Sequence, residues 1–155
     1  MTEMTDSLPG KLLSIFDVEV GRIESLGAMA FGERRVVMIN GGRAAGSLSG
    51  IIRAGGADWQ WQRHDGITEL RAHYVLETAE GDAIEIHSDG YRHGPAEVMA
   101  RLAAGEAVAP SDYYFRTAIT FHTAARDWRR LNGVIAIGIA ERRSDRVLIR
   151  VFEVL

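Results

Sequence analysis

Apolar and polar residues alternate along most of the chain with a period of two. Between residues 12 and 20, for example, apolar Phe16 and Val18 alternate with acidic Asp17 and Glu19. Successive side chains of a β-strand point to opposite faces, so this pattern indicates strands with one buried face. It predicts nine strands, at residues 12–20, 34–40, 47–54, 57–63, 67–78, 83–88, 113–123, 133–142 and 147–154.

Glycine-containing turns are expected between these strands. The pair Gly41-Gly42 is predicted to end the second strand, and Gly90 is predicted to end the sixth. Asp65-Gly66 lies between two alternating segments, which is one of the strongest short-range signals of a β-hairpin. Tight turns of this kind place consecutive strands next to each other in an antiparallel sheet.

One short helix is predicted among the strands. Pro95 stands at a plausible first helical position, where proline is favoured, and Gly105 can form the C-terminal cap. Val98 and Leu102 share one face of this helix, which is therefore expected to plug or brace the sheet. A shorter helical turn is predicted at residues 126–131.

Many consecutive strands joined by short turns favour an all-β architecture over a parallel α/β sheet. We expect a mainly β fold, a single antiparallel closed β-barrel of about eight to nine strands with one short helix, because closure removes exposed strand edges. A β-sandwich is the alternative. The 155 residues fit one domain, residues 1–155, of which residues 1–9 are expected to be flexible.

Composition limits the classes of partner. A net charge of −3 gives no general attraction to phosphate backbones or anionic lipid, so neither nucleic acid nor membrane is expected as a partner. The chain has no cysteine, which excludes disulfides, thiolate nucleophiles and cysteine-ligated metals. The first residues are polar and acidic, unlike a secretory signal, and the longest apolar stretch is too short to span a bilayer. A soluble, cytoplasmic protein is expected.

Five segments of the chain carry a family resemblance: Gly55-Gly56-Ala57-Asp58-Trp59-Gln60, Asp65-Gly66, Ala72-His73-Tyr74-Val75-Leu76, Arg92-His93-Gly94-Pro95 and Tyr113-Tyr114-Phe115-Arg116-Thr117. In order and spacing they resemble the domain-of-unknown-function family numbered 3237, over almost the whole chain. The resemblance implies a compact antiparallel β-barrel of bacterial and fungal origin with no generally established activity. His73 departs from the arginine that the resemblance leads us to expect there.

Asp58 and Tyr74 are the first candidates for chemistry. Asp58 follows two glycines and precedes Trp59, and a carboxylate beside aromatic groups is a favourable environment for a general base. Alternatively, Asp58 caps the turn and Trp59 fills the core. Tyr74 falls on the apolar face of its strand, where it either fills the core or directs its hydroxyl at a ligand.

Two arginines lie next to aromatic residues, Arg92 after Tyr91 and Arg116 after Phe115. An arginine that projects into a semi-enclosed cavity requires a partner, and it would hold a carboxylate, an enolate or a phosphate by paired hydrogen bonds. The structural alternative is a buried ion pair with Asp58.

The five histidines, at positions 64, 73, 87, 93 and 122, are scattered along the chain. No two of them have the helical i,i+4 spacing or the adjacent acidic ligands of a metal motif, so no metal is predicted, although strand pairing could bring three together. His93 is the one histidine that we expect to act in acid–base chemistry.

The leading hypothesis is a small-barrel enzyme that binds a compact carbonyl or carboxylate compound and transforms it by proton transfer, through isomerisation, cyclisation or hydration, without a cofactor. Asp58 would be the base and His93 a further acid–base group, while Tyr74 and Arg116 would stabilise developing negative charge. The ligand-binding residues would be Arg92, Trp59, Tyr114 and Asn132. Two alternatives remain, a non-catalytic small-ligand binding protein and a solid barrel whose surface forms a homo-oligomer.

Overall fold

The computed structural model describes residues 6–155, and residues 1–5, part of the expected flexible segment 1–9, lie outside the described residues. The described chain forms nine strands: β1 (Gly10–Met29), β2 (Gly32–Gly46), β3 (Gly50–Ile52), β4 (Gly56–Arg63), β5 (Thr68–Glu77), β6 (Ala83–His93), β7 (Tyr114–Thr123), β8 (Ala136–Arg142) and β9 (Arg146–Val154). It also forms the α-helix α1 (Ala96–Ala103) and two 3₁₀ turns, η1 (Pro110–Asp112) and η2 (Arg126–Gly133).

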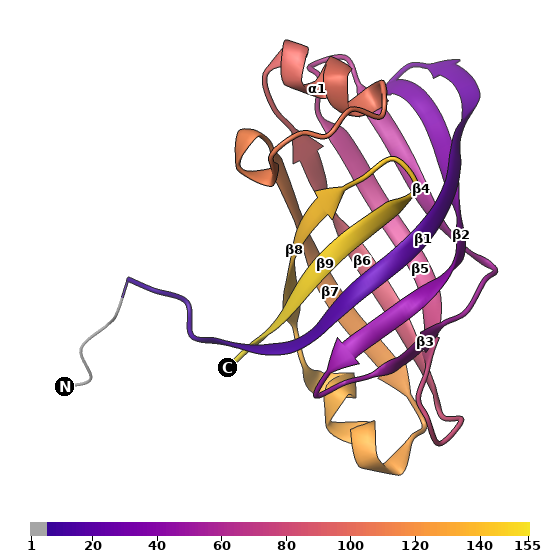
Figure 1. The fold of residues 1–155 in the computed structure, drawn as a ribbon, viewed down its shortest axis with the longest axis vertical. Helices are drawn as coiled ribbons and strands as arrows, with labels where there is room; N and C mark the ends of the chain where they lie inside the picture. Colours follow the sequence, from indigo (N-terminus) through magenta and orange to yellow (C-terminus); the bar gives the residue numbers. More distant parts are fainter. Residues whose placement is uncertain (1–5) are drawn as a thin grey trace.

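All strand pairings are antiparallel, and they follow one another around a barrel-like sheet (Figure 1). From β5 the pairings run through β6, β7, β8 and β9 to β1, which also pairs with β2. The strands β3 and β4 then connect β2 back to β5. Every strand of the described chain therefore has at least two neighbours, and β2 and β5 have three each. The mostly antiparallel fold with one short helix agrees with the sequence prediction.

The first hairpin is longer than the alternation predicts, and Gly41-Gly42 does not end its second strand. β1 continues to Met29 and β2 passes through both glycines to Gly46, with a register shift opposite them between Glu19 and Val20. Gly42 has φ +140°, and a Cβ there would lie 2.1 Å from the carbonyl oxygen of Asp17. The glycines bend a continuous strand here, a role that glycine also has at barrel corners.

Gly90 likewise lies inside a strand, whereas the sequence prediction ended the strand there. β6 continues through Gly90 to His93 and pairs with β7 along this length. A Cβ on Gly90 would lie 2.0 Å from the carbonyl oxygen of Arg116, so glycine permits a close approach of the two strands. The Asp65-Gly66 hairpin between β4 and β5 is present as predicted.

A different helical element lies over each end of the barrel. Helix α1 lies over one end, and η2, in orange, lies over the opposite end (Figure 1). Near η2 the interior is solidly packed, with Leu131, Leu76 and Phe121 almost fully buried. Gly105 ends α1 as predicted, with φ +79° and its N–H donating to the carbonyl of Leu102 at 3.1 Å.

In the part of the chain that the structure describes, we find no helix with the length and apolar character needed to cross a membrane.

Candidate functional site

A polar cavity lies inside the barrel at the end covered by α1. Its volume is about 40 Å³, and apolar side chains such as Val18, Val37 and Ile149 form much of its wall. The polar residues of the wall come from strands far apart in the sequence: Asp58, Gln60, Tyr74, Ser88, Arg92, Thr117 and Arg142. A cavity of this volume accommodates about three water-sized groups, since one such group needs about 10–15 Å³ by the same measure.

Strand alternation explains why these side chains point inward. On β4, Asp58 and Gln60 face the interior because the intervening Trp59 faces outward, where its side chain is 42% exposed. On β8, Ala136 and Ala140 are buried, and Arg142 continues the same inward face at the end of the strand.

Asp58 is the one carboxylate in the wall of the cavity. Its Oδ2 accepts a 2.8 Å hydrogen bond from Nε2 of Gln60, and its Oδ1 accepts a 3.0 Å hydrogen bond from the main-chain N–H of Arg71. Burial raises the pKa of Asp58, and this effect exceeds the opposing effects of the two hydrogen bonds and of the positive charges on Arg92 and Arg142. The environment of Asp58 therefore favours the protonated form of its carboxyl group more than water does.

Arg92 is a buried cation without a carboxylate partner. The residue is 6% exposed, its guanidinium carbon lies 5.1 Å from the ring centroid of Phe115, and its Nε has no hydrogen-bond partner in the described chain. Burial and the neighbouring charge of Arg142 lower the pKa of Arg92 to about 10. Arg92 still carries its proton at neutral pH, so a positive charge lies next to the cavity, and the negative charge of Asp58 stabilises it less than burial destabilises it.

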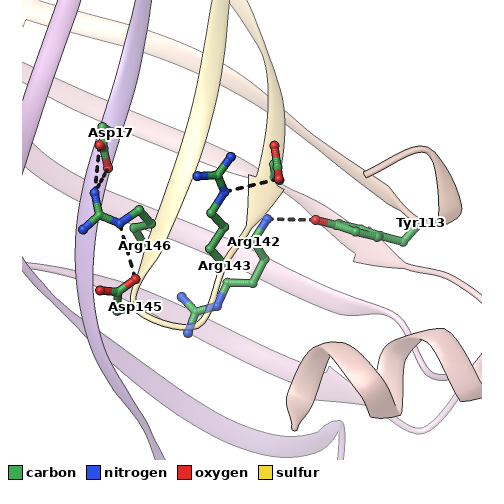
Figure 2. A network of polar contacts seen from close by, with 7 residues as sticks. Asp17, Tyr113, Arg142, Arg143, Asp145 and Arg146 are labelled. Atoms are coloured by element: carbon green, nitrogen blue, oxygen red, sulfur yellow. Dashed lines mark hydrogen bonds and ion pairs between the residues drawn. The ribbon is translucent and has the colours of Figure 1, made fainter. Parts of the chain in front are cut away.

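Arg142 is the second cation of the cavity. Figure 2 shows its main-chain N–H donating to the hydroxyl of Tyr113 over 2.9 Å, while its guanidinium has no bonded partner among the residues drawn. Within residues 6–155, no ion pair of 4.0 Å or less joins Asp58 to Arg92 or Arg142. Two guanidinium groups and one carboxylate leave the cavity with one positive charge in excess.

Several buried polar atoms at the cavity have no partner. In the described chain, four such atoms belong to residues of its wall: Gln60 Oε1, Tyr74 Oη, Arg92 Nε and Thr117 Oγ1. Buried polar atoms in folded proteins nearly always have a hydrogen-bond partner, and leaving one without costs about 1–3 kcal/mol. These four atoms are therefore available to bond to a polar molecule in the cavity.

A larger hollow adjoins this cavity. It has a volume of about 300 Å³, lies between the barrel mouth and α1, and has Met99 and Leu102 of the helix in its wall. Arg92 and Arg142 line both spaces. The two guanidinium groups therefore stand at the boundary between the mouth and the interior. Arg35, also at the mouth, is already paired with Glu33 at 2.9 Å.

The structure places the sequence-predicted site residues in three environments: the interior cavity, the outer face of the sheet, and the end of the barrel at η2. Asp58, Tyr74 and Arg92 line the interior cavity together. Trp59 and Tyr114 are 42% and 45% exposed and do not line it.

His93 and Arg116 accompany Tyr114 on the outer side of β6 and β7. The ring of His93 stacks on that of Tyr114 with centroids 4.9 Å apart. Arg116 donates to the carbonyl of Phe115 over 2.9 Å and lies 5.4 Å from the Tyr114 ring centroid. These three side chains form their own group, which does not line the interior cavity.

Asn132 lies at the opposite end of the barrel, in η2. Its side-chain oxygen accepts from the main-chain N–H of Thr123 at 2.9 Å, and its amide nitrogen donates to the carbonyls of Thr123 and Arg129. These bonds attach η2 to the end of β7. In the structure Asn132 therefore supports the local backbone. It lies at the end of the barrel opposite to the cavity that contains Asp58.

The sequence prediction missed four polar residues of the cavity: Gln60, Ser88, Thr117 and Arg142. A signal for each was present. Gln60 lies two residues after Asp58 and so points to the same side of β4, and Ser88 follows the inward-facing Ile84 and Ile86 at the same two-residue spacing. Thr117 falls between the apolar residues Phe115 and Ile119, and Arg142 follows Ala136, Gly138 and Ala140 on the inward face of β8. The same rule excludes Arg116, which neighbours the inward-facing Phe115 and so points outward.

Comparisons with known proteins place this architecture among uncharacterised proteins. The model of the family described as "Protein of unknown function (DUF3237)" matches residues 11–154. The chain is similar to the crystal structure of a conserved protein of unknown function from Rhodopseudomonas palustris, with 36% identity, a TM-score of 0.91, and coverage of 98% of this chain and 100% of that one.

Two further solved structures have the same fold. One is described as a beta-barrel like protein from Acinetobacter baumannii, with 33% identity, a TM-score of 0.85, and coverage of 99% of this chain and 100% of that one. The other is described as an enzyme from Penicillium herquei, with 18% identity, a TM-score of 0.73 and full coverage of both chains. At 18% identity the likeness shows the fold alone.

Proposed function

Because this chain belongs to the family described as "Protein of unknown function (DUF3237)", whose description assigns no activity, we propose a function from the interior site itself: binding of a small organic anion with a carbonyl group, followed by proton transfer through Asp58. The observation that carries the proposal is the pair of guanidinium groups, Arg92 and Arg142, without a carboxylate partner at a partly buried cavity.

The excess charge favours a monoanion. A carboxylate between Arg92 and Arg142 would accept charge-assisted hydrogen bonds from both and remove the cost of two like charges in a buried setting. The part of a ligand that fits beside Asp58 in the small interior cavity has about three non-hydrogen atoms, as an acetyl group does. The rest of the ligand would occupy the hollow of about 300 Å³ beneath α1.

Asp58 and Tyr74 supply the groups that proton transfer requires. The Asp58 carboxylate would remove a proton from the carbon next to the carbonyl, leaving an enolate, and the carboxylic acid so formed would return the proton to carbon. Burial and the nearby charge of Asp58 raise the pKa of Tyr74, which keeps its hydroxyl protonated. The hydroxyl, which has no partner in the described chain, would donate to the enolate oxygen. This step uses no cofactor.

A non-catalytic binding protein is the second candidate. Both oxygens of Asp58 already accept hydrogen bonds, from Gln60 and from the main chain of Arg71. These bonds are equally suited to a carboxylate that holds β4 against β5. The two candidates share the anion site and differ only in whether the proton of the bound molecule exchanges.

Levulinate is a suitable probe because it combines a carboxylate with an acetyl group. We expect calorimetry to show binding of levulinate and at least tenfold weaker binding of 2-pentanone, which lacks only the charged end. Proton NMR in D₂O would follow exchange of the protons next to the ketone. Exchange that the protein accelerates and that Asp58→Asn abolishes supports proton transfer, and binding without exchange supports the second candidate.

Arg142→Met provides the test of the anion site, and Arg143→Met is its matched control. Arg143 is the next residue of the chain, and its guanidinium pairs with Glu141 at 3.3 Å outside the cavity. We expect Arg142→Met to lower levulinate affinity at least about tenfold, as loss of one partner of a buried charge pair does. Equal affinities in the two variants would overturn the proposed site.

A further inference from the structure

Four residues with metal-binding side chains gather on the outer face of three neighbouring strands. His73 of β5 is paired directly with His87 of β6, and Glu85 of β6 is paired with His122 of β7. Glu85 and His87 are two residues apart on one strand, so their side chains share a face. This outer cluster lies on the face opposite to the interior cavity, since the even-numbered residues of β6 point inward.

The side chains of the outer cluster converge on one carboxylate oxygen. Nε2 of His73 lies 3.1 Å from Oε1 of Glu85, and Nε2 of His87 contacts the same oxygen. The rings of His73 and His87 stack with centroids 4.2 Å apart and an interplanar angle of 15°. The ligand atoms of His73, Glu85 and His87 all lie within 4.8 Å of one another. Nδ1 of His122 is 3.9 Å from the same oxygen of Glu85.

These positions are close to those that a tetrahedral metal ion requires. Zinc binds imidazole nitrogen and carboxylate oxygen at about 2.0–2.2 Å, which places any two ligand atoms about 3.3–3.6 Å apart. The side chains are 37–54% exposed in His73, Glu85 and His87, so they can adjust by the small distances needed without disturbing the core.

We propose that His73, Glu85 and His87 bind a divalent transition-metal ion of the zinc class on the outer face of the barrel. Imidazole and carboxylate donors select such ions over magnesium and calcium, which prefer oxygen ligands throughout. Three protein ligands leave a fourth position that faces solvent beside His122. This geometry is that of an open zinc site rather than a closed structural one, and the ion would join β5 to β6.

Titration of the tag-free full-length protein with Zn²⁺, followed by calorimetry, tests the site. We expect one ion per chain, no comparable binding of Mg²⁺, and a higher melting temperature with Zn²⁺ because the ion binds the folded state only. His87→Ala and Glu85→Gln should each weaken Zn²⁺ binding at least about tenfold. Melting curves recorded without metal would verify that both variants are folded.

His64→Ala is the matched control, because His64 is an exposed histidine in the turn between β4 and β5. It should leave Zn²⁺ affinity unchanged. The proposal is overturned by the absence of one-to-one Zn²⁺ binding, or by binding that survives both His87→Ala and Glu85→Gln. Levulinate binding plays no part in this experiment, so the proposal for the interior site and the proposal for the outer cluster are tested independently.

Discussion

The main-chain N–H of Arg142 donates a 2.9 Å hydrogen bond to the hydroxyl of Tyr113, which is buried to 6% exposure (Figure 2). Tyr113 precedes β7 and Arg142 ends β8, so the bond joins two strand ends at the mouth of the barrel. It holds the backbone of Arg142 in place while the guanidinium of the same residue stays available at the cavity. The hydrogen bond thus connects the position of Arg142, a residue of the proposed anion site, to a tyrosine outside the interior cavity.

Tyr113→Phe removes this hydrogen bond and little else. We expect the free energy of unfolding to fall by about 0.5–1.5 kcal/mol, the usual contribution of one such bond. Levulinate affinity should also fall, by less than in Arg142→Met, because the guanidinium remains but its backbone is less constrained. Urea unfolding and calorimetry measure the two effects, and an affinity equal to that of the unaltered protein would show that the bond does not position Arg142.

Asp58→Asn should change how stability depends on pH. The pKa of Asp58 is raised in the folded state, so between its ordinary value of 3.8 and the raised value the folded protein holds a proton that the unfolded chain has released. The contribution of Asp58 to stability therefore increases as the pH falls through this window, and at neutral pH the ionised group is destabilising. We expect Asp58→Asn to be more stable than the original protein at pH 7.

Urea unfolding of both proteins between pH 4 and pH 8 measures this difference. The stability advantage of Asp58→Asn should shrink as the pH falls toward 3.8, where the original carboxyl group becomes neutral in both states. An advantage that stays constant, or that grows on acidification, would contradict a raised pKa for Asp58.

Arg92→Met should stabilise the ligand-free protein and impair binding. Replacing buried charge with an apolar side chain of similar volume is often neutral or stabilising by about 1–4 kcal/mol. Arg92 has no carboxylate partner in the described chain, so its removal leaves no opposite charge unpaired within 4.0 Å. Levulinate affinity should fall at least about tenfold.

Arg116→Met is the control for this prediction, because Arg116 lies with Tyr114 on the outer side of the sheet. We expect its levulinate affinity to match that of the unaltered protein. Thermal melting measures the stability of both variants, and calorimetry measures their affinity for levulinate. A marked loss of stability in Arg92→Met would mean that its charge is compensated within the folded chain.

Gly90→Ala should destabilise the barrel strongly. The added Cβ would lie 2.0 Å from the carbonyl oxygen of Arg116 and 2.7 Å from Cα of Thr117, and both are backbone atoms that cannot move aside alone. Separating β6 from β7 should cost at least about 1–3 kcal/mol, as overpacking does. At Gly133 nothing lies within 4 Å of an added Cβ, so Gly133→Ala should have an effect below about 0.5 kcal/mol. Similar unfolding midpoints for the two variants would contradict the close approach.

Alternation in the sequence was sufficient to predict that nine strands exist, but it placed several of their ends wrongly. On β5 it placed Tyr74 on the apolar face of the strand, and the structure buries this residue at the interior cavity. It could not separate glycines that end a strand from glycines that bend one. Gly66 occupies a turn and Gly90 lies inside a strand, and only the distance to the neighbouring strand distinguishes them.

The grouping of residues was decided by the tertiary structure. The face of the sheet to which a side chain points is a local property of the chain, because it depends only on the two-residue repeat of a strand. Which inward residues meet depends on strand order and register, and these bring Asp58, Arg92 and Arg142 from three strands to one cavity. Register likewise places His73 against His87 outside. Such partners are set by closure of the whole sheet, which no short segment of the sequence encodes.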